Sequence, residues 1–194
     1  MKKLISTAKV LDAFAGILQV MSLVAAIIFV VSIVMLSVFN VEAYAFSATI
    51  ELGHFSFGLS SFDPQTVQQQ FLWMALPAVA VLVALHLISR VIRSILKPMK
   101  EGRPFDTAVS ANLRKLSWIV LIGGGVSSLA QLAAEAAMYR LFDFSSLFLS
   151  DRITSCTLNW EPDTTFVFLF LILFLLSCVF RYGEELQAQS DETL

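Results

Sequence analysis

An acidic residue inside a long apolar run is the feature of the chain most suited to chemistry. Glu135 lies near the end of the run 116–138, one helical turn after Gln131. A charged side chain is costly within a bilayer, so an ionisable residue at such a position marks a candidate site and needs a partner. Two interpretations stay open. Glu135 forms a structural pair with Arg140 near the membrane surface, or it contacts a cation, a proton or a ligand.

His86 and Asp12 are further ionisable residues at a similar depth, His86 within the second apolar run and Asp12 at the start of the first. We therefore expect Asp12 to be the partner of His86. A structural hydrogen bond, a proton sensor or relay, and a metal ligand are the alternatives for His86. The other histidine, His54, is expected on the opposite side of the membrane, which disfavours a metal site. The candidate ligand or ion residues are thus Glu135, Gln131, His86 and Asp12.

The chain shows no pattern typical of an enzyme. It has no zinc-type pair of histidines, no nucleophile elbow and no phosphate-binding glycine loop. We therefore expect no catalytic residues, no metal and no cofactor.

The apolar runs define the fold class. Of the 194 residues, 57% are hydrophobic and 14% are charged, with a net charge of −2 and a mean hydropathy of +0.78. Soluble domains carry about 25% charged residues. Four runs are long enough to cross the hydrocarbon core of a bilayer, which needs about 20 residues. The sequence predicts an all-α membrane protein, a four-transmembrane-helix bundle, with spans at 13–39, 71–92, 116–138 and 165–181.

The basic residues predict the orientation of these spans. Seven of the 13 Lys and Arg residues lie between Arg90 and Lys115. Short loops rich in Lys and Arg stay in the cytoplasm, so we expect both chain ends inside (N-in/C-in). This single membrane domain, 1–194, then has a cytoplasmic loop at 93–115, a cytoplasmic tail at 182–194, and outer segments at 40–70 and 139–163. A cleaved signal peptide is the competing interpretation of the first run, but a signal core has only about 7–15 apolar residues.

Small and polar residues follow one face of two spans. On the first span they are Asp12, Ala15, Gly16, Gln19, Ser22 and Ala26. On the third they are Ser117, Gly124, Ser128, Gln131 and Glu135. Membrane helices place such residues against one another, so a packing seam is one interpretation and a substrate path is the other. Three consecutive glycines at 123–125 indicate close helix packing or a flexible point.

The outer segments predict a small extracytoplasmic cap. Residues 44–59 combine aromatic and β-branched side chains with two glycines, a pattern typical of a β-hairpin. Residues 152–160 alternate enough to form a strand that pairs with it. We expect an acidic, aromatic, β-containing cap.

The basic loop has its own local signals. Pro98 should end the second helix, and Asp106 or Thr107 can cap the third. The basic cluster sets topology and contacts lipid, or it forms a docking surface for a cytoplasmic protein. The docking candidates are Lys97, Lys100, Arg103, Phe105, Arg114, Lys115, Glu184 and Glu185.

Two motifs together resemble a known family. One is Gly102-Arg103-Pro104-Phe105, followed by Asn112-Leu113-Arg114. The other is Phe180-Arg181-Tyr182-Gly183-Glu184-Glu185-Leu186-Gln187, followed by Ser190-Asp191-Glu192-Thr193-Leu194. With the four spans they resemble domain-of-unknown-function family 2975, a family of small bacterial membrane proteins. Family members have Thr or Ser where this chain has Asp106. The resemblance implies a bacterial inner-membrane location and a Cro-type helix-turn-helix regulator as partner.

These observations favour a non-enzymatic sensor or interaction protein. The cap would respond to an extracytoplasmic ligand, and the charged inner face would engage the regulator. The alternative is a small transporter, channel or immunity-type protein. Four spans are few for a transporter, so that alternative requires a homo-oligomer. The loop is short and lies beside anionic lipid, so we expect no direct binding of nucleic acid.

Overall fold

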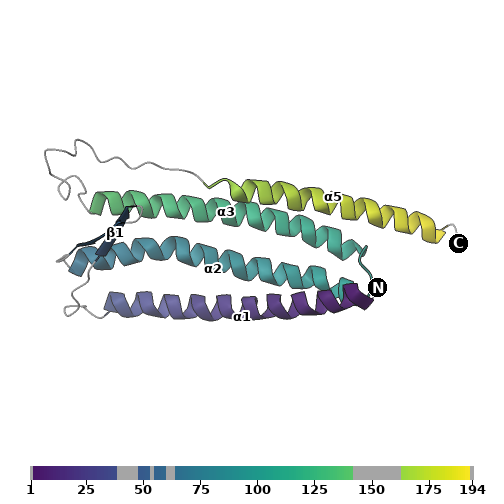
Figure 1. The fold of residues 1–194 in the computed structure, drawn as a ribbon, viewed down its shortest axis with the longest axis horizontal. Helices are drawn as coiled ribbons and strands as arrows, with labels where there is room; N and C mark the ends of the chain where they lie inside the picture. The colour runs from purple at the N-terminus through teal and green to yellow at the C-terminus, as the bar shows by residue number, and fades with distance from the viewer. Residues whose placement is uncertain (1, 39–47, 53–54, 60–63, 142–162, 193–194) are drawn as a thin grey trace.

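The computed structural model describes residues 2–38, 48–52, 55–59, 64–141 and 163–192 (Figure 1). Within these residues the chain forms four long helices and one short hairpin. The helices are α1 Lys2–Val38, α2 Pro64–Lys100, α3 Thr107–Leu141 and α5 Thr165–Glu192, and the strands are β1 Ala48–Leu52 and β2 Phe55–Leu59.

All four helices are long and apolar enough to cross a membrane, as the sequence predicts for a multi-pass membrane protein. The apolar stretches are Ile5–Met35, Phe71–Lys100, Thr107–Ala137 and Thr165–Ser190. A helix of 37 residues, such as α1 or α2, is about 55 Å long, whereas the hydrocarbon core is about 30 Å thick. The helices therefore continue beyond the predicted spans. Only residues 101–106 of the predicted loop 93–115 lie outside a helix.

Each helix packs mainly on the helices next to it in the chain. α1 lies against α2, α2 against α3, and α3 against α5 (Figure 1). The start of α1, the turn between α2 and α3 and the end of α5 lie at one end of the bundle, which we call the loop end. The strands β1 and β2 lie at the opposite end, which we call the hairpin end.

The small and polar face of α1 is the face that packs on α2. Ala15 and Ser22 are buried on this face, whereas the large apolar residues on the rest of α1 are exposed. Gly16 lies beneath the side chain of Arg93, because a Cβ atom at position 16 would be 3.7 Å from the Arg93 Cζ atom. This face is therefore a packing seam, the first of the two predicted interpretations.

The glycines of α3 bring two neighbouring helices close. A Cβ atom at Gly123 would lie 3.1 Å from the Cβ atom of Ala84 in α2. A Cβ atom at Gly124 would lie 2.3 Å from the Cβ atom of Phe166 in α5, which is too close for any side chain. Gly125 has no such neighbour within 4 Å. Two of the three glycines thus serve close packing, one toward each neighbour of α3.

The buried apolar core lies toward the loop end. Side chains from α2 and α3 form it, and Leu173 and Phe180 of α5 pack against it. Its buried members are Val91, Ile95, Val109, Leu113 and Leu116. This core holds the α2–α3 turn in place beside α5.

The end of α2 differs from the prediction. The helix continues through Pro98 to Lys100, so the predicted break at Pro98 is wrong. A proline removes one backbone N–H and crowds the preceding turn, but here it stands in the last turn, where little helix remains to disrupt. Gly102 ends the helix instead. Its φ of +80° suits glycine, and the next N–H, that of Arg103, donates to the Pro98 carbonyl at 3.0 Å.

Aspartates cap the helices that follow. The Asp106 carboxylate accepts a hydrogen bond from the Ala108 N–H at 2.9 Å, which confirms the predicted cap of α3. The Asp163 carboxylate accepts one from the Thr165 N–H, also at 2.9 Å, and caps α5. These bonds satisfy backbone donors that a helix start leaves without partners.

The strands β1 and β2 form an antiparallel hairpin within the predicted region 44–59. Ala48 lies opposite Leu59, and Leu52 opposite Phe55. The strand predicted at 152–160 lies outside the described residues. The structure thus contains two paired strands within the region predicted to form a hairpin.

Candidate functional site

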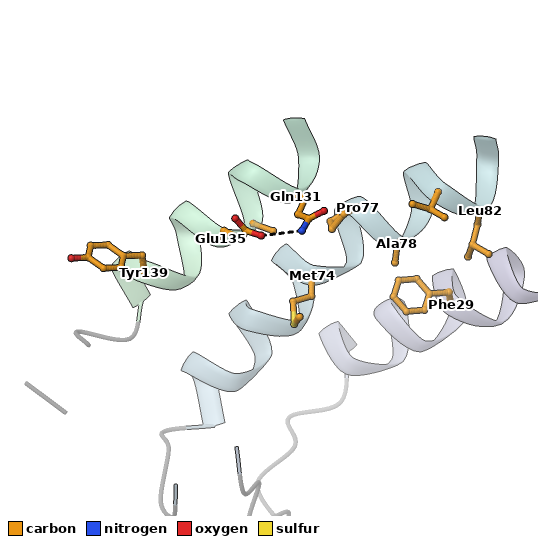
Figure 2. A pocket seen from close by; sticks show the side chains of 10 residues that line it. Phe29, Met74, Pro77, Ala78, Leu82, Gln131, Glu135 and Tyr139 are labelled. Atoms are coloured by element: carbon orange, nitrogen blue, oxygen red, sulfur yellow. Dashed lines mark hydrogen bonds between the residues drawn. The ribbon is translucent and has the colours of Figure 1, made fainter. Parts of the chain in front are cut away.

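A cavity of about 800 Å³ opens between α1, α2 and α3 toward the hairpin end (Figure 2). α3 contributes the polar part of its wall, and α1 and α2 contribute apolar side chains. The lining residues are Phe29, Met74, Pro77, Ala78, Val81, Leu82, Gln131, Ala134, Glu135 and Tyr139.

The polar residues of the cavity wall are Gln131, Glu135 and Tyr139, and the first two form a pair. The amide Nε2 of Gln131 donates to the carboxylate Oε1 of Glu135 at 3.0 Å (Figure 2). A carboxylate accepts several hydrogen bonds, so the bond from Gln131 leaves acceptor capacity for another group. The apolar wall suits hydrocarbon, and the carboxylate suits a cation or a hydrogen-bond donor. The cavity thus matches an amphipathic cation.

The predicted pair of Glu135 and Arg140 does not form among the residues that the structure describes. Helix neighbours on one face are three or four residues apart. Arg140 is five residues from Glu135, which places it on a different face of α3, and its side chain is exposed. Gln131, four residues away, is on the correct face and forms the contact.

The predicted pairing of His86 with Asp12 is wrong. The His86 Nδ1 atom lies 3.3 Å from the backbone carbonyl oxygen of Gln19. In the antiparallel pair of α1 and α2, Gln19 is level with His86, and Asp12 is level with Arg93. Seven residues separate Asp12 from Gln19, which is about 10 Å along a helix. Asp12 is therefore too far along the seam to reach the imidazole.

Asp12 instead holds two cations of α2 near the loop end. Its carboxylate oxygens lie 2.7 Å from Lys100 Nζ and 3.4 Å from Arg93 Nε. Arg93 also donates from Nη1 to the Gln19 side-chain oxygen at 3.0 Å. These bonds engage Asp12 and Lys100 within the fold. Asp12 and His86 thus join α1 to α2, whereas Gln131 and Glu135 line the cavity, so the four predicted ligand residues do not form one site.

The docking candidate Phe105 is also used within the fold. Its ring lies 5.9 Å from the ring of Phe180, centroid to centroid. It also covers Gly183, because a Cβ atom at position 183 would be 2.7 Å from Phe105 Cδ1. The two motifs that carry the family resemblance therefore contact each other across the α2–α3 turn and α5.

Arg103 belongs to a local charge cluster in the turn. It pairs with Glu101 and lies 3.3 Å from the Asp106 carboxylate. The hydrogen bond and charge of Glu101, with the charge of Asp106, raise the pKa of the Arg103 guanidinium. The cluster stabilises the turn between α2 and α3.

The other docking candidates form two groups. Lys97 and Lys115 are exposed at the loop end and are available to a partner. Arg114 and Glu184 line a groove between α3 and α5, and Glu185 lies 3.6 Å from Arg181 Nε. The basic cluster is therefore only in part an open surface.

Sequence reasoning missed the residues that hold α5 in place. Phe166 packs on Gly124, and Phe174 lies beneath the guanidinium of Arg114 at 5.9 Å. In an apolar span these phenylalanines resemble lipid-facing residues, and nothing in the sequence distinguishes them. Within the described residues, no group of three or more His, Cys, Asp and Glu side chains is placed to bind a metal ion.

No family model matches the chain, and no curated protein or solved structure gives a significant match.

Proposed function

We propose that this chain is a non-enzymatic sensor of the bacterial cytoplasmic membrane, with its loop end in the cytoplasm. The orientation follows from the Lys and Arg residues between Arg90 and Lys115, because such segments remain inside. The hairpin end then faces outward and carries the cap, which the β1–β2 hairpin begins.

The cavity beside Glu135 supports ligand binding near the outer end of the bundle. Its apolar wall is open to a molecule that partitions into the membrane, and Gln131 and Glu135 provide a polar contact inside it. This combination of apolar space and one carboxylate is the observation that carries the proposal. The ligand is an amphipathic molecule with a cationic group.

Helix α2 offers a direct connection from the cavity to the loop end. Pro77 lines the cavity within α2, and the same helix carries Arg93 and Lys100, which hold α1 through Asp12. A proline weakens the helical hydrogen bonding near it, so occupancy of the cavity can tilt the outer part of α2 relative to the rest. The motion would then reach exposed Lys97. The resemblance to family 2975 implies the receiver, a Cro-type helix-turn-helix regulator.

Binding of a hydrophobic cation tests the ligand site. The probe is tetraphenylphosphonium, titrated against the full chain in lipid nanodiscs, with empty nanodiscs as the baseline for partition into lipid. We expect saturable binding that weakens by about tenfold in Glu135→Gln, because a hydrogen bond or contact to a charged group is worth about that factor.

The matched control is Glu185→Gln, which removes an exposed carboxylate at the loop end and should leave probe binding unchanged. Equal binding by Glu135→Gln and the unmodified chain would contradict a cation site in the cavity.

Co-purification with the regulator tests the signalling part. Charge reversal at Lys97 and Lys115 should lower recovery of the regulator, since both side chains are exposed. Charge reversal at Lys100 is not suitable, because that residue holds Asp12. Unchanged recovery with both exposed lysines reversed would contradict docking on this surface.

A small oligomeric transporter or channel is the second candidate. The ionisable Glu135 within a span favours it. Each described helix packs mainly on its sequence neighbours, so copies of the chain would have to complete a pathway. Ion flux through liposomes that contain the chain, lost in Glu135→Gln, would favour this function over the sensor.

A further inference from the structure

A second hollow, separate from the cavity, lies between α3 and α5 near the loop end. Its volume is about 510 Å³, and its wall changes in character along its length. Phe174 lines the part deeper in the span, whereas Thr107, Arg181 and Glu184 line the part near the loop end. We call this hollow the α3–α5 groove.

Two guanidinium groups border the α3–α5 groove. Arg114 lies over the ring of Phe174, with its Cζ atom 5.9 Å from the ring centroid. This contact orients the guanidinium and uses none of its N–H donors. The Nε atom of Arg181 lies 3.6 Å from the Glu185 carboxylate, so the two terminal nitrogens of Arg181 can still donate hydrogen bonds. Guanidinium groups bind phosphate through paired hydrogen bonds, which makes the groove suitable for a phosphate group.

Glu184 adds a negatively charged carboxylate to the same groove. Its Oε1 atom is buried, and no hydrogen-bond donor among the described residues reaches it. The serine hydroxyls of the groove are already engaged, because Ser110 donates to the Thr107 carbonyl at 3.2 Å and Ser177 to the Phe174 carbonyl at 2.7 Å. A buried acceptor without a donor is unfavourable. The occupant of the groove must therefore bring a donor, and a cationic one suits a carboxylate best.

The surroundings of the α3–α5 groove select a lipid. The large apolar residues Leu171, Leu175 and Val179 are exposed along α5 beside the groove, on a helix suited to a membrane. Acyl chains can lie along that surface while the headgroup occupies the polar part. A soluble phosphate compound would leave this apolar surface without a partner.

We propose that the α3–α5 groove binds a phospholipid whose headgroup carries both a phosphate and a primary ammonium group. Arg114 and Arg181 bind the phosphate, and Glu184 accepts hydrogen bonds from the ammonium. A phosphatidylethanolamine headgroup has this chemistry. Phosphatidylcholine has the same charges but no ammonium N–H, and phosphatidylglycerol lacks the cation.

Native mass spectrometry of the purified full chain, titrated with each of the three lipids, tests the proposal. We expect one tightly bound phosphatidylethanolamine, at least about tenfold tighter than phosphatidylcholine, as the loss of hydrogen bonds to a charged acceptor predicts. Glu184→Gln should abolish this preference while retaining phosphate binding. Arg114→Gln and Arg181→Gln should weaken the binding of all three lipids.

Controls separate the groove from the basic surface. Lys115→Gln removes the neighbouring charge outside the groove and should leave the preference intact. Ala111→Phe fills the groove and should eliminate the bound lipid, whereas Ala108→Phe, one turn earlier and outside the groove, should not. Equal affinity for the three lipids, or an unchanged preference in Glu184→Gln, would overturn the proposal. Displacement by soluble phosphoethanolamine at equal concentration would overturn the assignment to a lipid.

Discussion

The ring of Phe105 lies directly over Gly183, so that a Cβ atom at position 183 would be 2.7 Å from Phe105 Cδ1. This contact joins the turn between α2 and α3 to the polar end of α5. It explains why one motif supplies an aromatic ring and the other a glycine. Close packing of a ring on a glycine, in addition to ion pairs, thus stabilises the loop end.

Gly183→Ala should destabilise the chain by about 1–3 kcal/mol, because an added methyl group overfills a close contact. Unfolding of the purified protein in a detergent titration measures the loss. The double variant with Phe105→Ala should recover part of it, because the methyl group then occupies the vacated space. No recovery in the double variant would show that the ring is not the obstacle.

Gly124→Ala and Gly125→Ala form a matched pair. Position 124 has the Cβ atom of Phe166 only 2.3 Å from an added Cβ atom, whereas position 125 is open. We expect Gly124→Ala to separate α5 from α3 and to cost about 1–3 kcal/mol. Gly125→Ala should be neutral or stabilising by up to about 1 kcal/mol, because alanine favours the helix. The same unfolding titration compares them, and a larger loss at position 125 would contradict the packing described.

Asp12 and Lys100 should show a strong coupling. Asp12→Ala leaves Lys100 and Arg93 without their shared carboxylate, and a hydrogen bond to a charged group contributes about 1.5–3 kcal/mol. A double-mutant cycle over Asp12→Ala and Lys100→Ala isolates the pair. Ser32→Ala is a control on the exposed part of α1, where the hydroxyl donates to the Ile28 carbonyl of its own helix. Strictly additive losses for Asp12 and Lys100 would argue against the contact.

The start of α5 should respond to acid. The Thr165 hydroxyl and N–H, as donors to the Asp163 carboxylate, hold the pKa of that carboxyl below its ordinary value of 3.8. A carboxyl with a lowered pKa stabilises the folded state above its ordinary pKa, and the contribution is lost as the pH falls through the lowered value. Hydrogen-exchange protection of the first turn of α5 should therefore decrease below about pH 4. Asp163→Asn keeps a capping side chain that does not titrate, so its protection should not show this decrease.

The sequence predicts the helices of this protein better than their contacts. Four apolar runs are enough to identify the spans, since length and composition decide whether a helix can cross a membrane. The small and polar face of α1 also predicts its packing side, because only small residues let two membrane helices approach closely. The cap at Asp106 can also be predicted, because a helix cap depends only on residues close together in the sequence.

Which residues of two helices contact each other depends on the register between the helices, and the sequence of one helix does not give that register. Asp12 and His86 lie in facing helices at similar predicted depths, yet the pairing of Gln19 with His86 puts them about 10 Å apart along the seam. The cavity is also unpredictable from one helix, because its wall comes from α1, α2 and α3. Glu135 could be selected from its sequence position alone, but the apolar space beside it could not.

Packing of each helix on its predecessor also describes an order of assembly. A nascent chain that enters the bilayer helix by helix offers every new segment a surface that is already in place. α1 packs as soon as α2 is inserted, and α5 then adds its interface with α3. A polypeptide that stops after Leu141 would therefore keep the α1–α2 and α2–α3 interfaces and would lose the α3–α5 interface alone.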